Sequence, residues 1–263
     1  MSYFNIITQS GDATVVTEYK PEKNKSDSYQ SEKALEDEFI RLLQEQSYEY
    51  IQIHKEADLI SNLRKQIEKL NNYIFSNDEW NRFFSENISN PNLGIVEKTR
   101  TIQEDYRKNL KRDDGSTKNI TLIDKSNIHN NILQVINQYT EDKGNYDNRY
   151  DVTILVNGLP LVHVELKRRG VVLREAFNQI ERYGRDSFWA GCGLYEFVQI
   201  FVISNGVNTK YYSNTTRDEH TKNTQNQSQR RKTSNSFEFT SYWADANNHP
   251  IPDLIDFTKT FFS

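Results

Sequence analysis

Two carboxylates and a lysine lie in a short stretch of the chain where they could assist a metal-dependent reaction. Asp151 opens an apolar, β-branched run, and Glu165 and Lys167 close a second run. Carboxylates on neighbouring strands can hold a hard divalent cation through oxygen ligands, and Mg²⁺ is the natural choice. Lys167 projects to the same strand face as Glu165, where it could orient a water or neutralise charge on a phosphorane-like transition state. The acidic-x-Lys triplet alone is a weak signal, because such alternation is common on solvated strands.

Further polar side chains accompany this triplet. Gln179 and Tyr183 lie one helical turn apart and can project together, or they can form a helix surface with a partly buried tyrosine. Arg182 beside them could meet a phosphate, although a lone arginine on a helix is commonly solvated. His163 shares the strand face of Glu165 and is either a general base or a packing residue.

A β-hairpin must position the two carboxylates. The Asn157-Gly158 pair between the two apolar runs is a strong turn signal. A regular two-residue loop would place Asp151 opposite Val164, on the other face from Glu165, because side chains alternate with period two. The carboxylates therefore share a face only if the loop has an odd number of residues or the hairpin contains a bulge. A left-handed Gly158 followed by Pro160, which donates no ladder bond, suits a bulge.

The remaining apolar periodicity predicts helices alternating with strands. A right-handed, parallel strand-helix-strand crossover should follow the hairpin. The predicted helices are 28–46, 59–74, a patch around 80–84, one segment within 92–117 that ends in a basic loop at 111–118, 128–139, 173–186 and 253–262. The predicted strands are 48–54, 119–123, 151–156, 161–167, a central strand 197–204 and an edge strand 210–213.

One more carboxylate on the first long helix could join the site. Glu32 lies nearer than Glu36 to the centre of the apolar stripe on a helical wheel, so Glu32 is predicted to point inward. The alternative is that Glu32 only favours the helix dipole from the first turn. Glu36 remains a second candidate for the same role.

Composition limits the class of protein. The 263 residues can bury one large core, and the 35% hydrophobic content with a mean hydropathy of -0.83 suggests polar insertions on a smaller core. The lone Cys192 excludes a disulfide framework and a cysteine-based metal site, and it favours a reducing compartment, the cytoplasm. We find no apolar stretch long enough for a membrane span. The net charge of -4 argues against a protein that coats nucleic acid electrostatically.

We expect a single α/β domain over residues 1–263. Within it we predict an extended N-terminal arm, a core with a helical insertion, a mobile polar loop and a C-terminal helical segment. These parts span residues 1–27, 28–213 with the insertion at about 55–117, 214–236 and 237–263.

Taken together, these motifs resemble the PD-(D/E)xK nuclease superfamily, and more closely the N-terminal endonuclease domain of the restriction (R) subunit of type I restriction-modification enzymes. The resemblance spans most of the chain, through the blocks SYQSEKALEDEFI, NRYDVTILVNGLPLVHVELKRRG, REAFNQIERY and FVISNG. It implies a restriction-endonuclease-like core. It assigns metal-binding carboxylates to Asp151 and Glu165, the catalytic lysine to Lys167, and a QxxxY motif beside the site to Gln179 and Tyr183. Glu32 would match the helical acid.

The resemblance also implies an activity and its partners. The expected activity is Mg²⁺-dependent hydrolysis of double-stranded DNA without sequence recognition by this domain, in a complex with modification and specificity subunits. The family's ATP-driven motor has no counterpart here, because the sequence contains no GxxxxGK[ST] phosphate loop, so we expect the nuclease domain alone. Two alternatives are a DNA-contacting or subunit-docking module with little activity in isolation, and another superfamily nuclease such as a repair enzyme.

Overall fold

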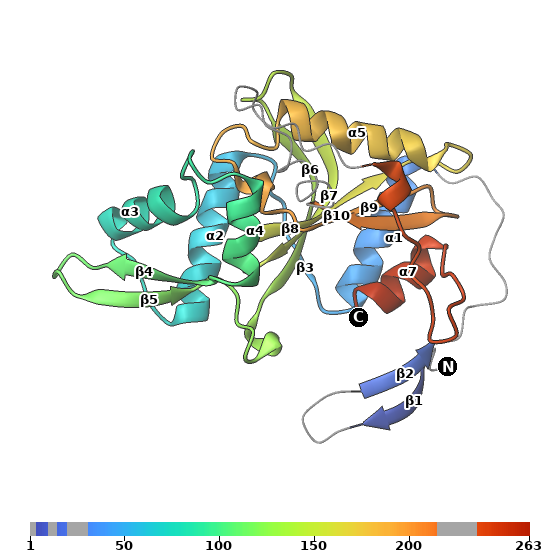
Figure 1. Ribbon diagram of the computed structural model, residues 1–263, viewed down its shortest axis with the longest axis horizontal. Coiled ribbons are helices and arrows are strands. Elements are labelled where there is room, and N and C mark those ends of the chain that lie inside the picture. Colours follow the sequence, from blue (N-terminus) through green and yellow to red (C-terminus); the bar gives the residue numbers. More distant parts are fainter. Residues whose placement is uncertain (1–3, 10–14, 20–30, 215–235) are drawn as a thin grey trace, which may run out of the picture.

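A six-stranded mixed sheet forms the centre of the computed structural model, which describes residues 4–9, 15–19, 31–214 and 236–263 (Figure 1). The strands lie in the order β10-β9-β8-β7-β6-β3. Their bounds are β3 Glu49–Tyr50, β6 Leu133–Glu141, β7 Asn148–Val156, β8 Leu159–Leu166, β9 Ile200–Ser204 and β10 Thr209–Ser213. The pairs β8-β9 and β3-β6 are parallel, and the other neighbours are antiparallel. The predicted α/β class with a small mixed sheet is confirmed.

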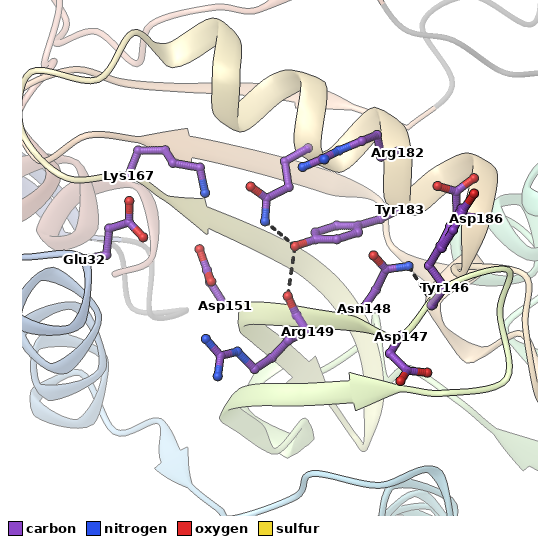
Figure 2. A pocket seen from close by; sticks show the side chains of 11 residues that line it. Glu32, Tyr146, Asp147, Asn148, Arg149, Asp151, Lys167, Arg182, Tyr183 and Asp186 are labelled. Carbon is purple, nitrogen blue, oxygen red and sulfur yellow. Dashed lines mark hydrogen bonds between the residues drawn. The ribbon is translucent and has the colours of Figure 1, made fainter.

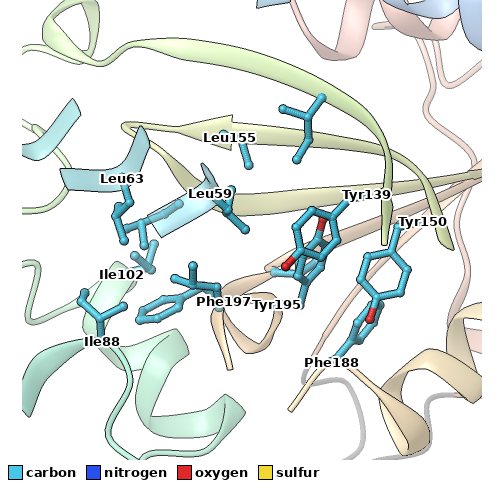
Figure 3. Close-up of a cluster of buried hydrophobic side chains, with 14 of the residues drawn as sticks. Leu59, Leu63, Ile88, Ile102, Tyr139, Tyr150, Leu155, Phe188, Tyr195 and Phe197 are labelled. Carbon is cyan, nitrogen blue, oxygen red and sulfur yellow. The ribbon is translucent and has the colours of Figure 1, made fainter. Parts of the chain in front are cut away.

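Helices cover both faces of this sheet. They are α1 Glu32–Glu45, α2 Glu56–Asn71, α3 Asn77–Asn87, α4 Ile95–Gln103, α5 Leu173–Asp186 and α7 Leu254–Phe261. α1 and α7 pack on one face, against alternate residues of β7 and β8 such as Val152 and Val164. On the other face, α5 and the helical insertion α2 to α4 form a larger core that includes Tyr150 and Phe188 (Figure 3).

Local sequence explains where several helices begin. The Ser31 hydroxyl accepts a hydrogen bond from the Ala34 amide at 3.2 Å and caps α1. Ser76 and Glu79 form a reciprocal capping box at α3. The Asp253 carboxylate accepts from two amides in the first turn of α7. The predicted helices at α1, α2, α3, α4, α5 and α7 are confirmed by the observed helix bounds.

The hairpin between β7 and β8 contains a bulge, which is required for Asp151 and Glu165 to lie on the same face of the sheet. Gly158 is left-handed, with φ of 83°. Leu155 pairs with Pro160 but Ile154 pairs with Val162, so Leu161 is the extra residue. Beyond the bulge Val152 opposes Val164. The same register, continued by one residue, places Asp151 opposite Glu165.

Two parts of the predicted secondary structure are wrong. Residues 128–139 were predicted to be a helix, but a 3-10 turn at Ile128–Asn130 leads into β6. β6 is an interior strand with apolar neighbours on both faces, so its apolar residues do not alternate strictly and mimic a helical stripe. The second is β4 Arg107–Lys111, a strand that the prediction of a helix and then a loop within 92–118 did not include; β4 pairs with β5 Thr117–Thr121, and the predicted loop forms the turn between them.

Other predicted segments have clear outcomes. The strand predicted at 48–54 is reduced to the two residues of β3, and the helix predicted to 74 ends at Asn71. The central strand begins at Ile200, after a 3-10 helix at Leu194–Phe197, and β10 lies at the sheet edge as predicted. In the N-terminal arm, β1 Phe4–Gln9 pairs with β2 Val15–Tyr19, and a 3-10 helix at Phe237–Phe239 precedes α7. Residues 215–235 of the predicted polar loop lie outside the described residues.

The described helices are all too short or too polar to cross a lipid bilayer.

Candidate active site

Asp151 and Glu165 meet on the face of the sheet that α5 covers. Glu165 is fully buried, whereas Asp151 is partly exposed and lines a pocket (Figure 2). The Leu166 amide donates a hydrogen bond to Asp151 Oδ2 at 2.9 Å, which ties β7 to the end of β8. The bulged hairpin therefore delivers two carboxylates from two strands to one place.

Lys167 joins this pair from the residue after β8. Its amide donates to the Ser204 carbonyl at 2.8 Å, so the chain still follows β9 at this point. Its Nζ lies 2.6 Å from Glu165 Oε1 and 3.2 Å from the Leu166 carbonyl. The three residues of the predicted catalytic triplet are thus in direct proximity.

Burial makes both carboxylates weak acids, and repulsion by a neighbouring carboxylate adds to this effect at Asp151. Desolvation, and then the neighbouring Glu165 charge, raises the pKa of Asp151 to about 7. Desolvation also raises the pKa of Glu165 to about 7, against the opposing effect of the Lys167 ammonium. A cation placed between the carboxylates would relieve this repulsion.

His163 lies beneath Glu165 rather than in the pocket. The imidazole is fully buried, and the rings of Tyr150, Tyr183, Phe188 and Phe201 surround it. Its Nε2 is 3.6 Å from Glu165 Oε2, and both ring nitrogens lack a hydrogen-bond partner in the described structure. Burial lowers the pKa of His163 to about 4. This position fits the packing interpretation and not a general base that meets substrate.

The pocket has a volume of about 600 Å³ and lies under the N-terminal end of β7 and along α5. Its lining includes the predicted residues Glu32, Asp151, Lys167, Gln179, Arg182 and Tyr183. Sequence reasoning missed five further lining residues: Tyr146, Asp147, Asn148, Arg149 and Asp186. Glu165 does not line the pocket, because its side chain is fully buried beneath the pocket surface.

Arg149 is the most informative of the missed residues. It precedes Asp151 by two positions on β7, so the two side chains share a face. Arg149 is exposed, and within the described residues its side chain makes no hydrogen bond or ion pair. The period-two rule that linked Glu165 to Lys167 would have found it. Arg149 and Arg182 add two cations to the rim around Asp151.

Gln179 and Tyr183 brace the site from α5. Gln179 Nε2 donates to the Tyr183 hydroxyl, which donates in turn to the Arg149 carbonyl at 2.9 Å (Figure 2). Tyr183 is buried, and desolvation raises its pKa. The chain of bonds fixes β7 two residues before Asp151. Arg182, in contrast, is exposed at the pocket rim.

The prediction that Glu32 faces inward is wrong. Glu36 is buried, with 7% of its surface exposed, whereas Glu32 is exposed. Ile40 is also part of the buried stripe and moves its centre toward Glu36, which lies one turn away. Glu32 nevertheless reaches the pocket, where its Oε1 accepts from the Arg168 amide at 3.3 Å.

Glu36 occupies a polar niche beside β6. Asn137 Nδ2 donates to its Oε1, and Gln138 Nε2 donates to its Oε2. Desolvation raises the pKa of Glu36, and the Asp151 charge adds to this effect. Gln138 has a positive φ of 53°, and its position in the register is opposite Asp151. Both helical acids are therefore electrostatically near the triplet, and neither contacts Asp151 directly.

The side chains near Asp151 supply only part of the ligands that a hard cation needs. Within residues 31–214 and 236–263, no three His, Cys, Asp or Glu side chains are grouped to hold a metal. Asp151 and Glu165 supply two carboxylates, and the buried Glu165 Oε2 has no hydrogen-bond partner there. Oxygen ligands from two carboxylates with water in the remaining positions suit Mg²⁺, which keeps several waters.

Comparison with known proteins places these features in a family. The family model described as the N terminus of the type I restriction enzyme R protein matches residues 29–220. The chain is 45% identical over 257 residues to the type I restriction enzyme EcoprrI endonuclease subunit of Escherichia coli, covering 97% of this chain and 77% of that protein. It is 38% identical over 238 residues to the SsaAORF53P endonuclease subunit of Staphylococcus saprophyticus, covering 89% of this chain. In that case the match spans only 23% of the relative's length.

Proposed function

Because the chain belongs to the family of type I restriction enzyme R protein N-terminal domains, we propose that it is a Mg²⁺-dependent endonuclease that hydrolyses DNA phosphodiester bonds. The observation that carries the proposal is the bulged hairpin, which brings Asp151 and Glu165 to one face beside Lys167. A strand register without the bulge would have separated the carboxylates.

Each residue of the triplet has a role in this proposal. Asp151 and Glu165 would hold the ion, and bound Mg²⁺ would supply Lewis-acid stabilisation of the phosphate. The Lys167 ammonium would leave its contact with Glu165 and neutralise charge on the transition state, or orient the attacking water. Water attack on phosphorus would break the bond to the leaving oxygen, which takes up a proton.

The other pocket residues would place the substrate. Arg149 and Arg182 are exposed cations at the rim and would bind phosphates flanking the scissile one. Gln179 and Tyr183 would keep β7 in position, because they already bond to each other and to the Arg149 carbonyl. Glu32 would contribute a carboxylate from the pocket wall, through water or after a change of rotamer.

The proposal extends to the assembly and its location. We propose that double-stranded DNA is the substrate, that this domain has no sequence specificity of its own, and that modification and specificity subunits choose the target. ATP would act only through a motor region, for which this sequence has no phosphate loop. A cytoplasmic location fits the single cysteine.

One observation favours a second candidate function, a DNA-contacting or subunit-docking module with little activity alone. No third carboxylate is close enough to complete a metal-binding group within the described residues. An isolated chain of this kind would bind Mg²⁺ weakly and cut only when a partner or the substrate completes the site.

The test is to substitute the triplet in the complete, motor-containing assembly and to measure DNA cutting and ATP hydrolysis separately. We expect Asp151→Asn and Lys167→Ala each to abolish cutting and leave ATP hydrolysis intact. Asp142→Asn and Arg185→Ala are matched controls, because both residues are exposed and do not line the pocket. Cutting that survives either triplet substitution would refute the site.

A further inference from the structure

A β-hairpin at the periphery of the molecule has the shape and composition of a nucleic-acid contact. β4 and β5 pair antiparallel and are five residues long each. Figure 1 shows them projecting from one end of the molecule, beside α2 and α3 and outside the six-stranded sheet. The hairpin is not part of the pocket.

The two faces of this hairpin differ sharply. Leu110 and Ile120 are almost fully buried, at 1% and 0% exposure, and anchor one face on the helical insertion. The cations on that side are already engaged, since Lys108 pairs with Asp105 and Arg112 and Lys118 lie over the Tyr73 ring at 5.7 and 5.2 Å. The opposite face, called the ribbon face below, consists of Arg107, Asn109, Lys111, Thr117, Asn119 and Thr121.

The ribbon face has cations and hydrogen-bonding side chains but no carboxylate. Its cross-strand pairs are Arg107 with Thr121, Asn109 with Asn119 and Lys111 with Thr117. All of these side chains are exposed except the half-buried Thr121. The Arg107 guanidinium also lies 5.6 Å from the Tyr106 ring centroid.

Three carboxylates near the hairpin pair with cations outside the ribbon face. Asp105 pairs with Lys108, Asp113 with Arg82 and Asp114 with Arg112. Asp124 accepts hydrogen bonds from the Ser126 and Asn127 amides and from Asn130, and it also lies within electrostatic reach of Arg107. The ribbon face therefore keeps a positive charge with no carboxylate of its own, although Asp124 beside it offsets part of the Arg107 charge and the whole chain has a net charge of -4.

We propose that the ribbon face binds duplex DNA, as a second contact remote from the nuclease pocket. The major groove admits a two-stranded β-ribbon, and Arg107 and Lys111 would meet the phosphates that border it. Asparagine and threonine can donate and accept hydrogen bonds at phosphates and base edges. The proposal rests on the proposed function in one respect, that DNA is the macromolecule the chain meets, and it adds a surface that would hold the duplex while the pocket cuts.

The test measures DNA binding without cutting. A labelled 30-base-pair duplex is titrated with the full 263-residue chain in EDTA, from 50 to 200 mM KCl, and anisotropy gives the dissociation constant. The variant is Arg107→Gln with Lys111→Gln. The matched control is Lys65→Gln with Lys69→Gln, which removes the same charge from the exposed side of α2.

The proposal predicts that the ribbon variant binds about tenfold more weakly at 50 mM KCl, and that its slope of log affinity against log salt is smaller by about 1.8. The control should bind within about twofold of the unchanged chain. The proposal is overturned if both double variants lose affinity equally, if the ribbon variant binds normally, or if the unchanged chain does not bind the duplex. Normal binding by a ribbon variant that fails to join the assembly would assign the face to a protein partner instead.

These results are independent of the nuclease proposal. Cutting that survives Asp151→Asn would refute the active site and leave the anisotropy result standing. Normal binding by the ribbon variant would refute only the second contact.

Discussion

At the scale of single residues, burial destabilises the ionised forms of Asp151 and Glu165, and a bound cation would offset this destabilisation. The pKa of Asp151 rises from 3.8 to about 7, so the folded chain keeps a proton that the unfolded chain has lost in this pH range. The folded state therefore binds more protons than the unfolded state between these values, and the free energy of unfolding falls as pH rises from about 4 to about 7.

The substitution Asp151→Asn tests this destabilisation in the metal-free protein. Asparagine can still accept the Leu166 amide hydrogen bond but cannot ionise. Near pH 8 we expect the variant to be more stable than the unchanged chain by on the order of 2 kcal/mol, and the difference to shrink near pH 4. Urea denaturation at both pH values measures it.

Two further results belong to the same measurement. Addition of Mg²⁺ at pH 8 should stabilise the unchanged chain and not Asp151→Asn, because binding to the folded state alone raises stability. Asp142→Asn, at an exposed position, should match the unchanged chain in its stability at both pH values and in its stabilisation by Mg²⁺. A stability difference that is the same at both pH values would contradict the electrostatic explanation.

Arg149 gives the second prediction at this scale. Its exposed guanidinium lines the pocket beside Asp151, so Arg149→Ala should slow cutting by about tenfold or more through loss of a phosphate contact. Stability should change by less than about 0.5 kcal/mol, because the side chain is on the surface. Rates in the complete assembly are compared with those of Arg185→Ala, which is also exposed but outside the pocket. Equal rates for the two variants would remove Arg149 from the substrate contact.

Sequence could predict which residues bear the chemistry better than how they are oriented. The triplet and the Gln179 and Tyr183 pair were found because they form recognisable motifs, and the structure brings all five together. The inward-facing acid of α1 was misassigned to Glu32, because the predicted stripe of Leu35, Phe39, Leu42 and Leu43 omits Ile40, which moves the centre of the buried stripe toward Glu36. A helical wheel cannot show which neighbouring strand supplies amides for a buried carboxylate, as Asn137 does for Glu36.

At the scale of elements, the turn of the β7-β8 hairpin combines a left-handed backbone conformation with a close contact. Gly158 has φ of 83°, and a Cβ at this position would lie 2.6 Å from Leu63 Cα on α2. Gly115 has the same φ, yet a Cβ there would meet nothing within 4 Å. Alanine substitutions at the two glycines can therefore be compared. Gly115→Ala measures the cost of a side chain in a left-handed backbone conformation, and Gly158→Ala adds the cost of a steric clash.

We expect Gly115→Ala to destabilise the chain by about 1 kcal/mol and Gly158→Ala by about 3 kcal/mol or more. Gly158→Ala should also reduce cutting, since a shift of the turn against α2 moves the strands that place Asp151 and Glu165. Urea denaturation and cutting rates check both statements. Equal destabilisation by the two substitutions would show that α2 moves aside without cost.

Elements with one exposed face were easier to predict than elements inside the sheet. α1, α2 and α5 each have an apolar stripe on a polar helix, and their predicted positions are confirmed. β6 has buried residues on both faces, so its pattern of apolar positions also fits a helix. From the sequence we could predict only that the hairpin needs a bulge if Asp151 and Glu165 are to share a face. The sequence does not show that Leu161 is the extra residue.

At the scale of the whole molecule, the C-terminal helix completes the core that supports α1. α7 lies beyond residue 220, where the family match ends. The Tyr48 hydroxyl donates to the Phe262 carbonyl at 3.1 Å, and Gln46 Nε2 donates to the Thr258 carbonyl at 3.1 Å. The face of the sheet opposite the pocket is therefore covered by both ends of the described core, α1 near its start and α7 near its end.

Phe257 is the residue that tests this arrangement. It is fully buried between α1 and the sheet and stacks on Phe261 with ring centroids 4.7 Å apart. Phe257→Ala should lower the free energy of unfolding by about 3 to 5 kcal/mol, because it removes a large buried ring and leaves a cavity. Phe239→Ala is the matched control, since that ring is 51% exposed and its loss should cost less than about 0.5 kcal/mol. Urea denaturation followed by circular dichroism measures both, and a cost below about 1 kcal/mol at Phe257 would mean that α7 is only an appendage of the nuclease core.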